Sequence, residues 1–142
     1  EGFPPRIMAA SEDPRMRAKI VKEVYGQLLE QGFDSTRIAI LSTMKAGNKQ
    51  GTLTYLVSMF GLPLKGESDT LTDWKEGHSI WASTIKTFKG LEADCIIVTD
   101  CTLEDSKEGG LSELYVGTTR AKHQLVLIPA SSTAQRRLEA LL

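Results

Sequence analysis

The sequence predicts one three-layer α/β domain, residues 1–142, with a doubly wound and mainly parallel sheet. A chain of 142 residues falls in the usual size range of a single domain. Short apolar runs, typical of strands buried on both faces, alternate with segments whose apolar residues recur at helical spacing. This alternation implies parallel strands joined by right-handed crossovers, with helices on both faces of the sheet.

The first half of the chain is expected to contain one buried strand and two helices. A short apolar segment, Arg6 to Ala10, leads into acids and a proline, and helical spacing then predicts a helix over Pro14 to Gln31. The isoleucine-rich run Arg37 to Ser42 predicts a strand. A shorter helix is expected over Thr52 to Phe60. The interval Leu62 to Gly77 lacks a clear period and is expected to be mostly loop, with room for a short strand.

The second half is more regular. Three apolar runs predict strands, at Ser79–Thr84, Asp94–Asp100 and Gln124–Ile128. A turn and short helical segment over Ile85 to Ala93 separate the first two. An acidic loop, Glu104 to Gly110, and a helix, Leu111 to Ala121, separate the second and third. Ser131 or Ser132 is expected to cap a final helix.

Composition restricts the classes of function. A hydrophobic share of 41% and a charged share of 25% are ordinary for a globular domain, and a formal net charge of -1 means that any nucleic-acid contact must be local. No run approaches the ~20 apolar residues that cross a bilayer, so we expect no membrane contact and a cytoplasmic location. Cys95 and Cys101 lack metal-ligand spacing, so no metal site is expected. The chain starts at Glu1 without a methionine, and we expect an excerpt of a longer protein.

Two polar stretches are candidate sites, because ligands of a doubly wound sheet bind beyond the carboxyl ends of its strands. We expect Thr84 to Glu92 and Leu114 to Lys122 to lie there. The first combines hydroxyls with Lys86 and Lys89, which suits phosphate oxygens, and Gly90 lets the backbone approach a ligand closely. The alternative interpretation is a polar strand-to-helix connection with solvated lysines.

Glu92 and Arg120 have side chains suited to a nucleotide. A carboxylate such as Glu92 can accept hydrogen bonds from vicinal ribose hydroxyls. The guanidinium of Arg120 can stabilise charge on a transferring phosphoryl group. Arg120 is equally interpretable as a cation that complements a helix C-terminus. From the residues alone both alternatives stay open.

Taken together, the two stretches resemble motifs V and VI of superfamily 1 helicases of the UvrD/Rep type. In that family motif V has the form T-x-H-x-x-K-G-L-E after a strand, and motif VI has the form Y-V-A-x-T-R-A. Here they read TIKTFKGLEAD, from Thr84 to Asp94, and LYVGTTRAKHQLVL, from Leu114 to Leu127. The strand Arg37 to Ser42 is similar to the family's motif IV strand. The resemblance extends from about Arg6 to Ile128 and implies the second RecA-like domain of such a helicase.

This resemblance implies roles at the matching positions on the nucleotide side. Arg120 corresponds to the arginine finger, which reaches the γ-phosphate of ATP held by the partner domain. Glu92 corresponds to the ribose contact, and Gly90 to the close backbone approach. No G-x-x-x-x-G-K-[ST] loop and no Walker B acid occur in the chain. ATP and Mg²⁺ would therefore be held by the first RecA-like domain of the same protein, and the fragment alone is expected to be inactive.

On the nucleic-acid side, Thr84, Lys86, Thr87 and Lys89 would lie along single-stranded DNA. Lys86 departs from the family pattern, which usually has histidine there. Lysine keeps the ability to contact a phosphate but cannot stack or accept a hydrogen bond. That departure supports an alternative function, a non-catalytic RecA-like interaction module that binds nucleic acid or a protein partner. Gly117, in place of the commoner alanine, is expected to be tolerated.

The two tryptophans and two histidines have weaker functional interpretations. Trp81 lies in an apolar run and is expected in the core, whereas Trp74 lies in a polar interval and stays available to stack on bases. His78 and His123 are expected to have surface or capping roles. The acidic run Glu104 to Glu108 is expected to be a solvated connection.

Overall fold

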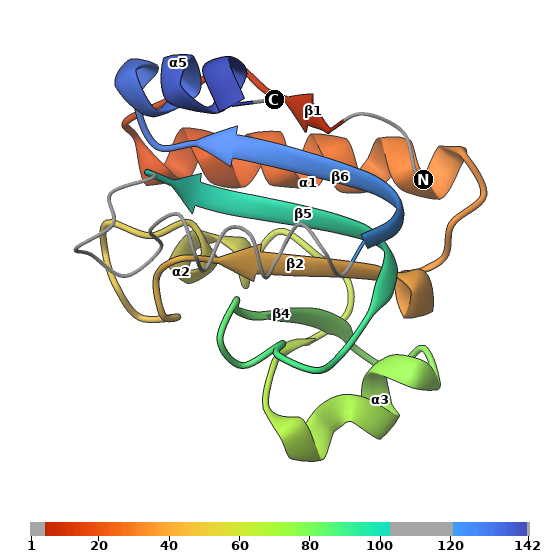
Figure 1. The fold of residues 1–142 in the computed structure, drawn as a ribbon. Coiled ribbons are helices and arrows are strands. Elements are labelled where there is room, and N and C mark those ends of the chain that lie inside the picture. The colour runs from red at the N-terminus through yellow and green to blue at the C-terminus, as the bar shows by residue number, and fades with distance from the viewer. Residues whose placement is uncertain (1–4, 103–120, 142) are drawn as a thin grey trace.

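The computed structural model describes residues 5–102 and 121–141. Within that part of the chain, six strands form one sheet in the order β1-β6-β5-β2-β4-β3, and every neighbouring pair is parallel (Figure 1). The strands are β1 (Arg6–Ile7), β2 (Ile38–Ser42), β3 (Leu64–Lys65), β4 (Ile80–Thr84), β5 (Ala93–Cys101) and β6 (Ala121–Pro129). This confirms the predicted α/β class and its parallel sheet.

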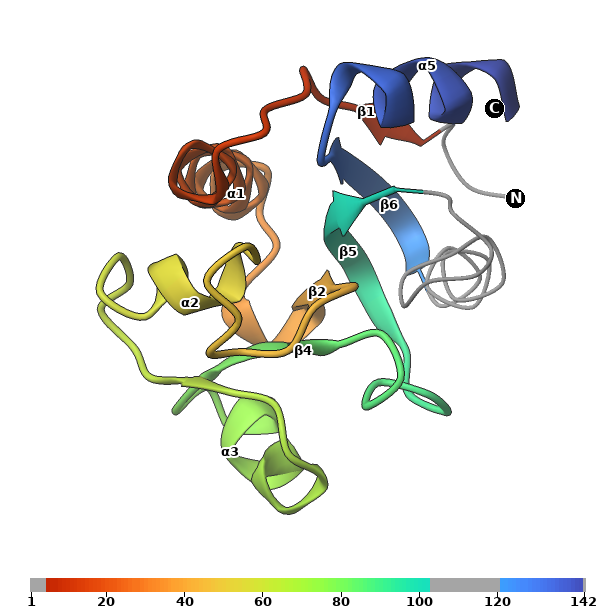
Figure 2. The same cartoon turned by 90° about the vertical axis from the view of Figure 1, so that its left-hand side faces the viewer.

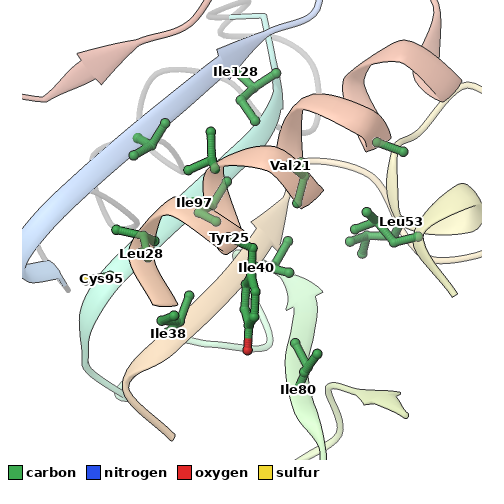
Figure 3. Packing of buried hydrophobic residues seen from close by; sticks show 14 residues of the cluster. Val21, Tyr25, Leu28, Ile38, Ile40, Leu53, Ile80, Cys95, Ile97 and Ile128 are labelled. Atoms are coloured by element: carbon green, nitrogen blue, oxygen red, sulfur yellow. The ribbon is translucent and has the colours of Figure 1, made fainter. Parts of the chain in front are cut away.

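One face of the sheet is covered by α1 (Pro14–Glu30) and α2 (Leu53–Leu56), which lie on the same side in Figure 2. The helix α1 begins as predicted, with Pro14 in its first turn and the Asp13 side chain accepting a hydrogen bond from the Arg15 amide at 2.9 Å. Figure 3 shows apolar side chains of α1 lying against those of the central strands: Val21, Tyr25, Leu28, Ile38, Ile40 and Ile97. This burial of apolar surface fixes α1 on the sheet.

The opposite face is covered by α3 (Leu71–Lys75) and α5 (Ser132–Leu141), with two short 3₁₀ turns, η1 (Ser35–Arg37) and η2 (Ser68–Thr70), in the connections. Three aromatic rings lie at the centre of this layer: the Trp74 ring centroid is 5.4 Å from that of Trp81 and 6.2 Å from that of Phe88. The Ser131 hydroxyl accepts from the Ala134 amide at 3.1 Å, so Ser131 is the cap of the last helix. None of the helices in the described ranges is long and apolar enough to span a bilayer.

The interval Leu62 to Gly77 is more structured than predicted. It contains β3, η2 and α3, and the expectation of a loop is wrong for α3. Trp74, expected in an open loop, is fully buried, and its indole nitrogen donates to the Ser35 carbonyl at 2.7 Å. Base stacking by Trp74 is therefore excluded in this fold. A helix of five residues is too short to produce a recognisable apolar period, which is why the pattern missed it.

Three other predicted boundaries differ from the structure. The helix expected over Thr52 to Phe60 is a single turn, because the chain must leave it to reach Gly61, Pro63 and β3. The segment predicted as helical after β4 is a series of hydrogen-bonded turns instead. Ala121, expected to end a helix, is the first residue of β6. The remainder of that predicted helix and the acidic loop before it lie outside the described residues.

Candidate functional site

The connection between β4 and β5 runs from one edge of the sheet to the other. Thr84, the last residue of β4, pairs with Ser42, the last residue of β2, so it lies at the carboxyl edge. Ala93 is the first residue of β5 and pairs with Ala121, the first residue of β6, so both lie at the amino edge. The green chain after β4 follows this return path in Figure 1.

This path separates the predicted site residues into two groups. Thr84 and the turn after it lie at the carboxyl edge, as expected. Glu92, which precedes Ala93, and Lys122, the second residue of β6, lie at the amino edge instead. The expectation that both polar stretches lie beyond the carboxyl ends is wrong for these residues. The reason is geometric: a connection between parallel strands must return across the sheet before the next strand starts.

At the carboxyl edge, the turn after Thr84 presents polar side chains to solvent. The Thr84 and Thr87 hydroxyl oxygens are 3.0 Å apart, and the Thr87 amide donates to the Thr84 hydroxyl at 3.3 Å. Ile85 and Phe88 are buried and anchor the turn. The side chains between and after these anchors are exposed: Lys86, Thr87 and Lys89. The local alternation of apolar and polar residues therefore displays hydroxyl and ammonium donors at one edge of the sheet.

At the amino edge, Glu92 is held in an ion pair. Its Oε1 lies 3.0 Å from the Lys122 Nζ, and both side chains are more than half exposed. The hydrogen bond that Lys122 donates to the Glu92 carboxylate raises the pKa of Lys122 above its usual value. Gly90 precedes this pair with φ = 87°, a left-handed conformation that favours glycine. The structure thus places Gly90 and Glu92 close together along the return path, away from the Thr84 turn.

A pocket of about 400 Å³ adjoins Glu92 at this edge. Its wall includes Gly90 and the charged side chains of Arg37 and Lys122, and Trp74 lines it from the core side. The Arg37 guanidinium is paired with Asp94, which also raises the pKa of Arg37. A concave space of this size with a few polar groups suits a small ligand.

A buried polar cluster that the sequence pattern did not reveal lies at the carboxyl edge. The Arg17 Nε is 2.8 Å from Asp100 Oδ1, and the two side chains are 3% and 0% exposed. Asp100 also accepts hydrogen bonds from the Thr52 amide at 3.1 Å, from the Thr52 hydroxyl at 2.7 Å and from the Ser42 hydroxyl. Asp100 has φ = 66°, unusual for a residue other than glycine. One sequence signal could have indicated this cluster. Arg17 is at helical spacing with the core residue Val21, so a charged side chain lies on the buried face of the predicted helix.

Arg120 and Gly117, with the part of motif VI from Leu114 to Arg120, lie outside the described residues, so the arginine finger remains a prediction. Across residues 5–102 and 121–141, no three His, Cys, Asp or Glu side chains form a group that could hold a metal ion. His78 and His123 are exposed, with distances of 3.7 Å to Glu76 and 3.9 Å to Asp94 respectively.

A family model described as the UvrD-like helicase C-terminal domain matches residues 79–128. The matched segment starts next to β4 and ends within β6, so it contains both candidate stretches and the return path that joins the two edges. A comparison with curated protein sequences gave no match. The parallel α/β sheet and this match both agree with the helicase domain expected from the sequence. Residues 79–128 are therefore similar to the C-terminal domain of UvrD-like helicases, and they form part of a parallel α/β sheet.

Proposed function

We propose that this domain is the C-terminal half of an ATP-dependent superfamily 1 DNA helicase or translocase. It contributes an arginine finger, a ribose contact and part of the single-stranded DNA path to a cleft shared with the first RecA-like domain of the same protein. The family match supports the general role. The two candidate sites lie on opposite edges of one sheet, which supports separate roles for them in DNA binding and in nucleotide binding.

The register between β5 and β6 is the observation that carries the nucleotide assignment. Ala93 pairs with Ala121 in parallel strands. Glu92 directly precedes Ala93 in the sequence, and Arg120 directly precedes Ala121. A ribose contact and an arginine finger would act on one nucleotide. The pairing of Ala93 with Ala121 supports this proposal, because it brings the ends of the two polar stretches to the same edge of the sheet.

Glu92 can exchange its present partner for a ribose at small cost. The Glu92–Lys122 pair is more than half exposed on both sides. Exposed pairs of this kind contribute only about 0–1 kcal/mol. The carboxylate can therefore accept hydrogen bonds from the 2′ and 3′ hydroxyls when a nucleotide enters, while Lys122 returns to solvent or contacts a phosphate.

In the proposed mechanism, ATP is held by the first domain and hydrolysis begins when the cleft closes. Water attacks the γ-phosphorus, and the bond between the β,γ-bridging oxygen and the γ-phosphorus breaks. Arg120 donates hydrogen bonds to the γ-phosphate oxygens and stabilises the charge that develops on them. Mg²⁺, held by the first domain, neutralises charge on the phosphates when bound. Closure and reopening move the Thr84 turn relative to the DNA grip of the first domain, which produces translocation.

The Thr84 turn supplies the proposed DNA contact of this half. Thr87, Lys86 and Lys89 present one hydroxyl and two ammonium groups to solvent at the carboxyl edge. Such donors bind phosphate oxygens without reading base sequence. Lys86 in place of the family's histidine favours a contact with phosphate over stacking on a base.

The test is Arg120→Ala in the full-length protein, measured by ATP turnover with and without single-stranded DNA. Loss of an arginine finger lowers kcat by about 10³-fold or more, and DNA affinity should not change. Arg136→Ala is the matched control, because Arg136 is exposed on α5. Unchanged DNA-stimulated turnover in Arg120→Ala would remove the finger assignment. A wild-type protein that binds DNA but never hydrolyses ATP would instead favour the non-catalytic module.

A further inference from the structure

A second concave space, which we name the α1 pocket, lies on the face of the sheet that α1 covers. It has a volume of about 410 Å³ and lies between α1, the segment 59–62 after α2 and the start of β4. Ile80, the first residue of β4, lines it and belongs to the core cluster beneath α1. The α1 pocket shares no lining residue with the pocket beside Glu92 and does not include the Thr84 turn. It is therefore separate from the proposed nucleotide and DNA contacts.

The wall of the α1 pocket is mostly apolar, and part of it faces solvent. Leu29 and Leu62, which line it from opposite sides of the connection, are 47% and 37% exposed. Met59 and Phe60 also line it, and the Phe60 ring packs edge-on against Tyr25 with 5.1 Å between the centroids. An apolar group that enters a concave surface of this kind removes its own surface and that of the wall from water.

Gly26 leaves free space against the helix that forms one wall. A glycine inside a helix is unfavourable because its backbone loses more conformational freedom than that of any other residue, but it lets another group approach the helix closely. Gly26 lies in the interior of α1 and lines the pocket. A Cβ atom at this position would meet no atom within 4 Å apart from the neighbouring backbone of α1. The described residues thus leave the room beside Gly26 unfilled.

The polar side chains of the α1 pocket can all donate hydrogen bonds. Lys22 is the only charged one among the described residues that line it, so no carboxylate faces the space. The Tyr25 hydroxyl is buried and has no hydrogen-bond partner in the described part of the chain, and Figure 3 shows its ring extending from α1 toward the sheet. Burial raises the pKa of Tyr25 to about 12, with a smaller contribution from Asp34, so this hydroxyl stays protonated and can donate. The pocket therefore combines apolar walls with an ammonium group and an unmet hydroxyl donor.

We propose that the α1 pocket binds a small organic anion with an aromatic or aliphatic body. The body lies against Leu29, Phe60 and the free space at Gly26, and acceptor atoms of the ligand meet Lys22 and Tyr25, which are one helical turn apart on α1. The volume of about 410 Å³ suits a single small molecule, and one cation in the wall matches one negative charge. This inference does not depend on the proposed helicase function.

The first test is a fluorescence titration of the full-length protein with anilinonaphthalene sulfonate, an aromatic anion. Gly26→Leu fills the free space at a helical position where no other group clashes, and leucine favours the helix, so the variant should stay folded. We expect Gly26→Leu to weaken binding of the dye at this site by about 10-fold or more. Gln27→Leu adds the same side chain at the next position, which is exposed and outside the pocket, and should leave the affinity unchanged.

The second test concerns the charge of the ligand. Phenylnaphthylamine has the rings of the first dye without the sulfonate group. Lys22→Gln should weaken binding of the sulfonate dye by about 3-fold and leave binding of the neutral dye unchanged. Lys19→Gln removes the same charge from an exposed position of α1 outside the pocket and is the matched control.

Two results would overturn this inference. If Gly26→Leu and Gln27→Leu bind the sulfonate dye equally well, the α1 pocket is not a ligand site. If Lys22→Gln behaves like Lys19→Gln, or affects both dyes equally, the pocket does not select an anion and the proposed class of ligand is wrong. Urea unfolding midpoints no lower than that of the unchanged protein show that the variants are folded. Neither readout involves ATP turnover or DNA, so failure here leaves the proposed function untouched.

Discussion

Replacement of Arg17 by methionine tests how the carboxyl edge is held together. Methionine keeps an unbranched apolar stem but removes the guanidinium, which donates to Asp100, Thr52 and the carbonyls of Ser11 and Gln50. The Asp100 carboxylate is fully buried and would lose its only cationic partner among the described residues. Breaking a buried pair in this way costs about 3–5 kcal/mol.

For Arg17→Met the cost should lie in the lower part of that range of free energies. The Asp100 carboxylate keeps its hydrogen bonds from the Thr52 amide, the Thr52 hydroxyl and the Ser42 hydroxyl after Arg17 is replaced. We therefore expect a loss of about 3 kcal/mol in the free energy of unfolding. For a domain of this size that loss corresponds to a fall of about 10 °C in Tm.

Urea unfolding of the 142-residue chain, with a double-mutant cycle to Asp100→Asn, measures this effect. Asparagine accepts the left-handed backbone at position 100 and has no charge to compensate. The double variant Arg17→Met/Asp100→Asn should lose less free energy of unfolding than the two single variants lose in sum, by about 1–3 kcal/mol. A loss below about 1 kcal/mol for Arg17→Met, with no coupling to Asp100, would show that the buried pair does not hold the carboxyl edge together.

Two further predictions concern buried groups. Burial raises the pKa of Cys95 to about 11, with a smaller contribution from Asp94, and the pKa of Cys101 to about 12, where Asp100 adds to the effect. Because an unfolded thiol has a pKa near 9, stability is fully present below pH 9 and is lost as pH rises through 11, so the urea midpoint should fall over that range. The fall should be smaller in Cys95→Ala, and identical profiles would contradict the assignment. Trp74→Ala should destabilise the domain by about 3–5 kcal/mol because its ring is fully buried. Weakened DNA binding with unchanged stability would instead restore the base-stacking role.

The sequence predicted the elements that have strong local signals. Pro14 and the acids before it marked the start of α1, and the isoleucine runs around Ile40 and Ile96 marked two central strands buried on both faces. α3 was missed because a helix of five residues shows no period. The burial of Trp74 follows from that helix and from the Ser35 carbonyl that accepts its indole hydrogen, and neither is visible in the sequence.

The candidate site, like the fold, could be predicted only in part from the sequence. The residue types in Thr84 to Glu92 indicated both phosphate and ribose contacts, but a linear pattern does not say at which edge of a sheet each residue lies. That depends on strand register, which places Thr84 beside Ser42 and Ala93 beside Ala121. The spacing of Arg17 and Val21 places a charge on the buried face of α1, but its partner Asp100 is 83 positions away, so only the tertiary structure identifies the pair.

The proposed placement of nucleotide and DNA contacts on opposite edges of the sheet is tested by steady-state ATP turnover of the full-length protein. Glu92→Gln and Thr84→Val/Thr87→Val are compared over separate titrations of ATP and single-stranded DNA. We predict that Glu92→Gln raises the KM for ATP and leaves unchanged the DNA concentration for half-maximal stimulation. Thr84→Val/Thr87→Val should raise that DNA concentration and leave the KM for ATP unchanged. If each variant shifts both quantities to the same extent, the nucleotide and DNA contacts are not separate, which contradicts the proposed placement on opposite edges.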